Sequence, residues 1–227
     1  LQLKDLEAVE KRLERVKKLA KTGNKEAQAE FDVLDKIRTS LEQGISVRAL
    51  EFTEKELEFV NLLQLITIKP VMYVCNVDED AAVDGNEYVE LVKDAVKNEG
   101  AEVLFLAVGT EADINELESY EERAEFLSDV GLDEPGAAKL IRYAYRLLNL
   151  QTYFTAGVKE VRAWTINIGD TAPQAAGVIH TDFEKGFIRA EVIKYNDYVA
   201  YGSEAKIKEA GKLSVEGKEY VVQDGDM

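Results

Sequence analysis

The chain has 227 residues, of which 46% are hydrophobic and 32% are charged, and its formal net charge is −16. This length allows a sizeable core in one large domain or two smaller ones. The acidic balance argues against loose electrostatic binding of nucleic acid over the whole surface. Residues 1–21 are the exception, because they carry seven basic and four acidic side chains.

Two apolar stripes with alternating three- and four-residue spacing predict two helices, which a turn at residues 22–24 separates. A short turn forces two such helices to pack antiparallel, as a helical hairpin. The stripes consist of Leu6, Val9, Leu13, Val16 and Ala20, and of Ala27, Phe31, Leu34, Ile37 and Leu41.

The outer face of the first helix is basic, and it has two interpretations. A charged helix face is commonly just a solvated surface, whereas a basic arm can also bind a partner. The residues concerned are Lys4, Lys11, Arg12, Arg15, Lys17, Lys18 and Lys21.

The next segment predicts a strand–helix–strand unit. Thr53 and Glu56 form a capping box for a helix that ends near residue 63. The apolar run at residues 71–75 indicates a buried strand of a parallel sheet, residues 87–98 a helix, and residues 103–108 a second strand. This order is typical of a right-handed βαβ unit.

Polar residues follow the first of these strands directly. Asn76, Val77, Asp78 and Glu79 come at its carboxyl end, where open α/β sheets bind ligands. An amide and a carboxylate at this rim suit a planar, hydrogen-bonding ligand such as a nucleobase. The alternative is an ordinary polar turn, because short motifs have a high false-positive rate.

The turn at residues 107–111 follows the second strand. Gly109 and Thr110 therefore lie on the same rim as the turn after the first strand. This shared rim favours the nucleobase interpretation.

The remaining chain predicts more helices and then a small α+β module. Ser119 and Glu122 form a capping box, and Pro135 begins another helix. We expect helices over 119–130 and 135–148, a loop and domain boundary at 155–157, a strand over 161–168, a helix to 179, one helical turn at 181–186, a strand over 188–193, a hairpin of 213–215 with 220–222, and a turn at 224–226.

Two runs in this part carry a resemblance to a known family. Residues 149–164 read Asn-Leu-Gln-Thr-Tyr-Phe-Thr-Ala-Gly-Val-Lys-Glu-Val-Arg-Ala-Trp, and residues 179–191 read Ile-His-Thr-Asp-Phe-Glu-Lys-Gly-Phe-Ile-Arg-Ala-Glu. Both closely resemble the YchF family, the Obg-like ATPases of the translation-factor class of P-loop NTPases. The resemblance covers the whole chain.

The resemblance implies an α/β fold in three parts. Residues 1–45 resemble the helical-hairpin (coiled-coil) insertion of the family. Residues 46–148 resemble the back half of its nucleotide-binding domain, a partial P-loop NTPase parallel sheet, with connecting helices. Residues 149–227 resemble its TGS domain, a small ubiquitin-like (β-grasp) module.

The resemblance also gives the polar rim a role. Asn76-Val77-Asp78-Glu79 matches the family's Asn-x-x-Glu variant of the Asn-Lys-x-Asp base motif. Adenine needs both an acceptor and a donor, which a carboxylate alone cannot supply. The resemblance implies that ATP is preferred over GTP, with Asn76 and the Val77 backbone on the base. Glu79 is expected either to contact the base or to position the Asn76 side chain. Asp78 is expected to face solvent or to cap the next turn.

Gly109 and Thr110 correspond to the family's second base-side loop, although they depart from the serine-alanine form common in the class. The phosphate-binding motif Gly-x-x-x-x-Gly-Lys-Ser/Thr does not occur in the chain. We therefore expect a fragment with no catalytic residue and no metal ligand of its own, inactive alone, with the ligands of Mg²⁺–ATP before Leu1. The family's last TGS strand, after Asp226, is also expected to be missing, which leaves an unpaired edge.

The family implies a cytoplasmic, ribosome-associated ATPase that acts as a regulatory switch in translation or stress response. The single cysteine, Cys75, is in keeping with a reducing compartment. Implied partners are ATP, GTP more weakly, the ribosome or RNA, and proteins that bind the hairpin, with no membrane and no DNA. The alternatives are an RNA-, ribosome- or protein-binding module that acts through the TGS domain and hairpin without catalysis, and a scaffold with a vestigial base motif.

Three aromatic features have a structural and a functional interpretation. His180, the only histidine, is expected to be structural and satisfied by a cap or a carbonyl, and catalysis is its alternative. Trp164 is expected in the core, and base stacking is its alternative. Tyr195, Tyr198 and Tyr201 are expected to pack, with RNA stacking as the alternative.

Overall fold

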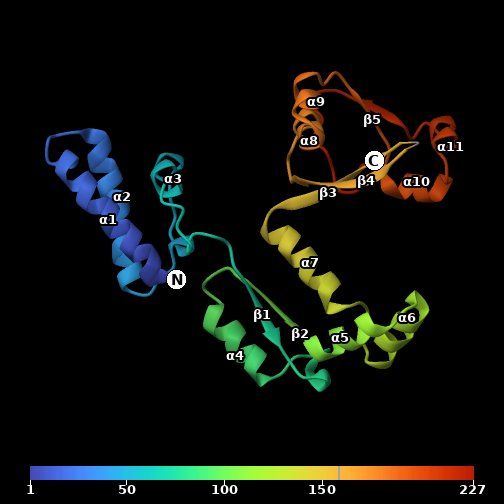
Figure 1. The fold of residues 1–227 in the computed structure, drawn as a ribbon, viewed down its shortest axis with the longest axis horizontal. Coiled ribbons are helices and arrows are strands. Elements are labelled where there is room, and N and C mark those ends of the chain that lie inside the picture. The colour runs from blue at the N-terminus through green and yellow to red at the C-terminus, as the bar shows by residue number, and fades with distance from the viewer. Residues whose placement is uncertain (158) are drawn as a thin grey trace. The chain divides into compact units, whose positions relative to one another are not determined.

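The computed structural model describes residues 1–157 and 159–227, and its mixed α/β class, with 52% helix and 15% strand, confirms the predicted class. The chain forms two compact units, residues 1–136 and residues 137–227 (Figure 1). Each unit is described by itself. None of the helices in the described ranges is both long and apolar enough to cross a membrane.

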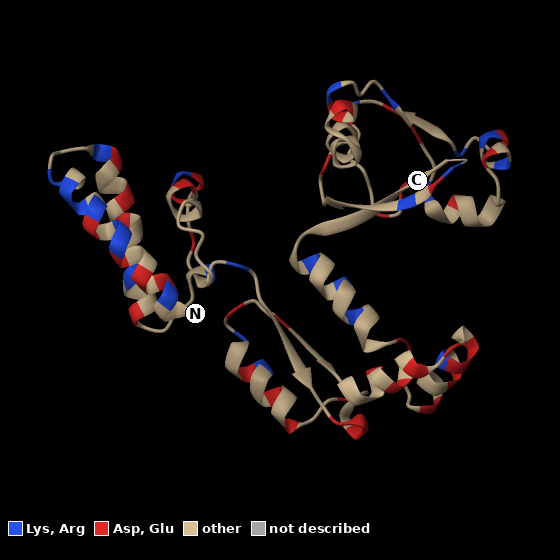
Figure 2. Ribbon diagram, viewed as in Figure 1, with Lys and Arg blue, Asp and Glu red and all other residues tan. Residues whose placement is uncertain are grey.

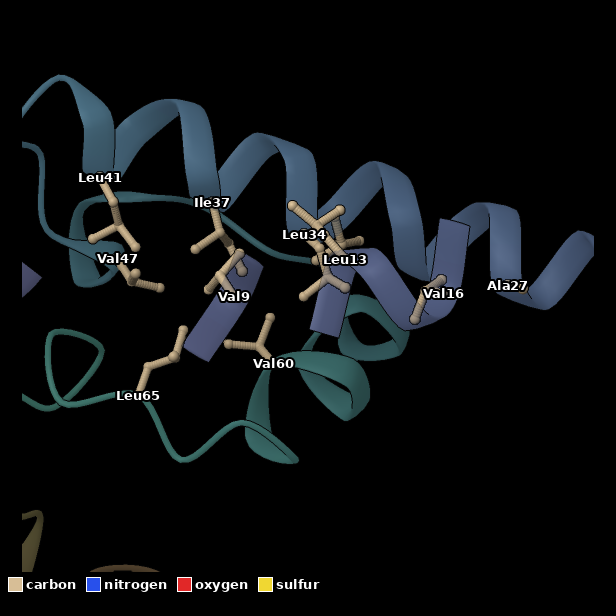
Figure 3. Close-up of a cluster of buried hydrophobic side chains, with 11 residues drawn as sticks. Val9, Leu13, Val16, Ala27, Leu34, Ile37, Leu41, Val47, Val60 and Leu65 are labelled. Carbon is tan, nitrogen blue, oxygen red and sulfur yellow. The ribbon is translucent and has the colours of Figure 1, made fainter. Parts of the chain in front are cut away.

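The first unit begins with the predicted helical hairpin. Helix α1 spans Gln2–Ala20 and helix α2 spans Lys25–Glu42. The side chain of Asn24 caps α2 by accepting hydrogen bonds from the amides of Glu26 and Ala27. The two stripes face each other, with Val9, Leu34 and Ile37 fully buried between them (Figure 3).

The base of the hairpin rests on a buried carboxylate. Asp5, only 2% exposed, accepts hydrogen bonds from the Ile66 amide at 2.9 Å and the Thr67 amide at 2.7 Å. A short 3-10 helix η1 (Val47–Ala49) and helix α3 (Glu54–Asn61) complete this region, and the Thr53–Glu56 capping box of α3 is confirmed.

The predicted strand–helix–strand unit is present. Strand β1 (Met72–Asn76) pairs in parallel with β2 (Glu102–Leu106), and helix α4 (Glu87–Val96) connects them. A 3-10 helix η2 (Glu79–Ala81) follows β1. The register pairs Asn76 with Leu106, so both strands end at the same rim.

The prediction of a fully buried β1 was wrong. Successive strand residues point to opposite faces. Cys75 packs in a cluster with Val89 of α4, but Val74 is 45% exposed. Among the described residues, β2 is the only strand that pairs with β1, so the sheet has two strands. The face of β1 that carries Val74 is therefore partly exposed.

The predicted turn at residues 107–111 was also wrong. Strand β2 ends at Leu106, and helix α5 spans Val108–Glu116. Gly109 and Thr110 therefore lie in the first turn of a helix. Helix α6 (Tyr120–Asp129), with its Ser119–Glu122 capping box, and helix α7 (Gly136–Leu147) follow as expected.

The second unit is the small α+β module. Strands β3 (Leu150–Ala156) and β4 (Val161–Asn167) form an antiparallel pair. Helix α8 (Ala172–Ile179) packs against them around Tyr153, Ile166 and Ala175. The predicted loop at 155–157 was wrong in part, because Thr155 and Ala156 still pair with β4.

Strand β5 (Ala190–Val192) pairs with β6 (Ser214–Glu216), so the predicted hairpin of 213–215 with 220–222 was wrong. Val221 instead bridges to Thr171. Tertiary packing, rather than the nearby glycine turn, decides this pairing. The other elements are helices α9 (Thr181–Lys185), α10 (Tyr195–Tyr201) and α11 (Glu204–Glu209).

The aromatic residues take structural positions. His180 caps α9, because its Nδ1 accepts a hydrogen bond from the Asp182 amide at 3.2 Å. Trp164 packs against the core cluster of this unit. Tyr195 and Tyr198 lie on helix α10 rather than on a loop, and the Tyr195 ring contacts that of Phe154, with 6.0 Å between centroids.

Candidate nucleotide-base site

The side chain of Asn76 joins the two loops at the carboxyl end of the parallel strands. Asn76 is the last residue of β1, and its Oδ1 accepts a hydrogen bond from the backbone amide of Val108 at 3.1 Å. Val108 is the first residue of α5, whose N-cap position, Ala107, has no side chain able to cap it. Asn76 therefore supplies a cap from another element, and its side-chain amide nitrogen has no acceptor in the part of the chain that the structure describes.

Two further donors lie beside this contact. The first hydrogen bond within α5 runs from the Glu111 amide to the Ala107 carbonyl, so the amides of Gly109 and Thr110 have no acceptor in the described ranges. A Cβ added at Gly109 would meet nothing within 4 Å, so the surface above it is open. The helix dipole makes this end favourable for an electron-rich acceptor.

Thr110 differs from Gly109 in its exposure. Its side chain is only 4% exposed, and its hydroxyl oxygen has no hydrogen-bond partner in the described part of the chain. Buried hydroxyls are usually hydrogen-bonded. Within this rim, Thr110 can offer its backbone amide, whereas its side chain points into the protein.

Val77 is anchored by both its backbone and its side chain. Its amide donates to the Leu106 carbonyl at 3.1 Å, and its side chain is 9% exposed within a core cluster. A ligand can therefore use the carbonyl oxygen of Val77 but not its amide, a restriction that the sequence did not reveal.

The two carboxylates of the motif are exposed. Asp78 precedes η2 without a side-chain capping bond, so it faces solvent, which was one of its two expected positions. Glu79 is the first residue of η2. Among the described residues no hydrogen bond joins Glu79 to Asn76, whose Oδ1 is held by Val108 instead. The base-side role of Glu79 stays a prediction.

A surface hollow lies beside the end of β1. It brings together Asn76 and Val77 but not Glu79, Gly109 or Thr110. Tyr88, on the first turn of α4, is 68% exposed, and it offers an apolar ring that sequence reasoning missed. The lining residues are Cys75, Asn76, Val77, Asp78, Asn86, Tyr88, Val89 and Val92.

The described residues contain no group of three or more His, Cys, Asp or Glu side chains placed to hold a metal ion. The rim offers amide N–H groups as donors and the Val77 carbonyl as an acceptor, a combination that suits hydrogen bonds to a base. The fold and this rim thus define an α/β protein with a candidate base-binding edge at the ends of its parallel strands.

Comparisons with known proteins give the family. The YchF-GTPase_C family model, described as a protein of unknown function (DUF933), matches residues 150–227. A protein of Escherichia coli O157:H7 named "Ribosome-binding ATPase YchF" is 51% identical over 227 residues, which cover 100% of this chain and 62% of that protein. The protein of the same name from Bacillus subtilis (strain 168) is 50% identical, over 99% of this chain and 62% of that protein.

A solved structure agrees with these matches. The chain is similar to the Schizosaccharomyces pombe YchF GTPase, with a TM-score of 0.86 and 36% sequence identity, over 100% of this chain and 62% of that chain. The chain belongs to the YchF family. It spans 62% of the length of the curated relatives described above.

Proposed function

We propose that this chain carries the base-recognition edge of a ribosome-associated ATPase of the YchF kind, which prefers ATP to GTP and acts as a regulatory switch. The observation that carries the proposal is the Asn76–Val108 contact, which joins the two rim segments and leaves amide donors free beside it. Relatives named as ribosome-binding ATPases support it.

The donors and acceptors of the rim suit adenine. Adenine donates only through its N6 amino group, which the Val77 carbonyl or the Glu79 carboxylate can accept. Its ring nitrogens are acceptors, which the Asn76 side-chain amide and the amide of Gly109 or Thr110 can satisfy. Guanine presents two adjacent donors, for which a carboxylate directly in the base plane is the better partner. The site comprises Asn76, Val77, Glu79, Gly109 and Thr110, with the last two acting through their backbones.

Hydrolysis needs parts that these 227 residues do not provide. Phosphoryl transfer depends on positioning the phosphates and neutralising their charge, and the sequence has no Gly-x-x-x-x-Gly-Lys-Ser/Thr motif. Mg²⁺ bound with ATP supplies that neutralisation. We propose that this chain alone binds the nucleotide weakly, through its base, and does not hydrolyse it.

The three-part division of the chain belongs to the same proposal, with residues 1–45 as the hairpin insertion, 46–148 as part of the nucleotide-binding domain, and 149–227 as the TGS domain. Ribosome association implies a cytoplasmic protein. A second candidate function is an RNA-, ribosome- or protein-binding module without catalysis, which the basic face of α1 favours.

Photolabelling tests the base site. The chain is irradiated with 8-azido-ATP, and the labelled peptides are identified by mass spectrometry. We expect label in peptides that contain residues 76–79 or 107–111, and we expect ATP to compete better than GTP. Label confined to other peptides, or stronger competition by GTP, would contradict the proposal.

A further inference from the structure

The tip of the helical hairpin carries a group of exposed cations. All five are exposed, and none forms an ion pair or a side-chain hydrogen bond within the described ranges. Figure 2 shows Lys and Arg, in blue, on the last part of α1 and at the start of α2. We call this group the basic tip; it consists of Arg15, Lys17, Lys18, Lys21 and Lys25.

The cations nearer the hairpin base have carboxylate partners. Lys4 and Lys11 both pair with Glu7, at 3.1 and 2.5 Å, and Arg12 pairs with Glu30 at 2.6 Å. These two lysines lower the pKa of Glu7 to about 2, mainly through the hydrogen bond from Lys11. The basic face foreseen from the sequence is therefore reduced to its distal part.

Interactions with the helix dipoles explain the positions of only some of these cations. Cations in the last turn of a helix are favourable, which accounts for Lys17 and Lys18 in α1. The same dipole makes a cation unfavourable at the start of a helix, and Lys25 is the first residue of α2. Lys17 and Lys21 also lie four residues apart, where like charges repel. The basic tip thus carries a cost that stability does not explain.

The composition of the tip favours a phosphate backbone over a protein surface. Residues 14–26 contain no aromatic side chain, whereas protein–protein interfaces are enriched in aromatic anchors. Lysine and arginine side chains are the usual contacts to nucleic-acid phosphates. A surface hollow at the tip is lined by four cations, together with Glu14 and Leu19.

We propose that the basic tip binds the RNA backbone of the ribosome, an inference that rests on the proposed ribosome association. The net charge of −16 repels RNA from most of the protein. The tip is then the part that can approach RNA, so charge sets the orientation of the bound protein as well as its affinity.

Co-sedimentation with purified bacterial ribosomes over a range of KCl concentrations tests this inference. In the tip variant all five cations are replaced by glutamine, a good helix former. In the matched control Lys4, Lys11, Lys69, Lys93 and Lys97, all exposed and outside the tip, are replaced by glutamine. Both variants change the net charge equally, and thermal melts verify that both fold. A third variant, K21Q/K25Q, alters only the C-cap of α1 and the first residue of α2.

We expect the tip variant to bind at least about tenfold more weakly than the wild-type chain near 0.1 M salt, with a salt slope smaller by about 3. The control should bind within about twofold of wild type, and K21Q/K25Q should fall between them. Equal losses in tip variant and control would overturn the proposal, because net charge alone would then explain them.

Two other results separate the proposals. If the wild-type chain binds ribosomes and the tip variant binds equally well, the tip inference fails while ribosome association stands. If the wild-type chain binds no ribosomes at any salt concentration, both fail. Protein-free ribosomal RNA is the second probe: binding that depends on the tip supports an RNA partner, and its absence would assign the tip to a ribosomal protein instead.

Discussion

The side-chain oxygen of Asn76 accepts a hydrogen bond from the amide of Val108 at 3.1 Å, across 32 residues of sequence. This contact caps helix α5 from strand β1, and it links the two rim segments that the parallel pairing of β1 with β2 brings together. Among the described residues, the side-chain nitrogen of Asn76 has no hydrogen-bond acceptor. The oxygen of this side chain therefore has a structural role, and its nitrogen is a candidate for ligand binding. Substitutions can test the two roles separately.

Asn76→Asp keeps an oxygen acceptor and places a negative charge at the start of α5, where the dipole favours it. We expect this variant to be as stable as the wild-type chain and to show the same slow hydrogen exchange at the Val108 amide. Asn76→Ala removes the acceptor and should cost about 1 kcal/mol, with faster exchange at Val108. Hydrogen exchange followed by NMR measures both, with Asn98→Ala as an exposed control. Unchanged exchange in Asn76→Ala would mean that the contact does not cap α5.

Asp5 anchors the hairpin to the rest of its unit. Its carboxylate accepts from the amides of Ile66 and Thr67 and from the Thr67 hydroxyl, at 2.6 to 2.9 Å. Asp5→Ala leaves these buried donors unpaired and should lower the free energy of unfolding by about 3 kcal/mol. Urea denaturation measures this, with the exposed Glu10→Ala as the control. Equal effects of the two substitutions would argue against the anchor.

Glu99 links the hairpin base to β1, because it accepts from Arg48 at 2.5 Å and from the Tyr73 hydroxyl at 2.9 Å. The Arg48 hydrogen bond is the main cause of the lowered pKa of Glu99. Folding thus favours the carboxylate, so its stabilisation is present above the unfolded pKa near 4.5 and is lost as pH falls through the lower folded value.

We expect Glu99→Gln to be less stable than the wild-type chain at pH 7, by about 1 kcal/mol or less for this partly exposed pair. The difference should narrow as the pH falls below about 4.5. Urea titrations at several pH values, with Glu10→Gln at an exposed position as the comparison, check this. A difference that stays constant with pH would show that the ion pair does not contribute.

Tyr153 gives the second unit an alkaline limit. Burial raises its pKa to about 12, and its hydroxyl donates to the Ala175 carbonyl at 2.8 Å. Folding favours the neutral phenol, so its contribution is complete below pH about 10 and is lost as pH rises through 10 towards 12. Tyr153→Phe should reduce the decrease in stability at alkaline pH. Tyr120→Phe, at an 81% exposed position, should leave that decrease unchanged. Thermal melts from pH 8 to 11 compare them, and parallel curves for all three proteins would contradict the assignment.

Local signals in the sequence predicted much of the first unit. Both capping boxes, the turn at Asn24 and the two heptad stripes depend on residues a few positions apart, and all are present. The parallel pairing of β1 with β2 followed from the strand–helix–strand order. These features need no information from distant parts of the chain.

Features that depend on distant contacts were missed. Helix α5 has no capping residue of its own and needs Asn76. The pairing of β6 with β5 competes with an apparent local hairpin, and only the packed module decides between them. The motif placed Asn76 and Val77 where β1 ends, but it could not show that the Val77 amide already donates a hydrogen bond to the Leu106 carbonyl.

The most direct test of the base site uses the amide of Gly109 as a reporter. Proton–nitrogen NMR spectra of the chain, recorded during titration with ATP and separately with GTP, measure both affinities at this rim. We expect ATP to shift the Gly109 signal at lower concentration than GTP, and Asn76→Asp to weaken the ATP shift by about tenfold while Asn98→Asp does not. A larger response to GTP, or an ATP response unaffected by Asn76→Asp, would contradict the account.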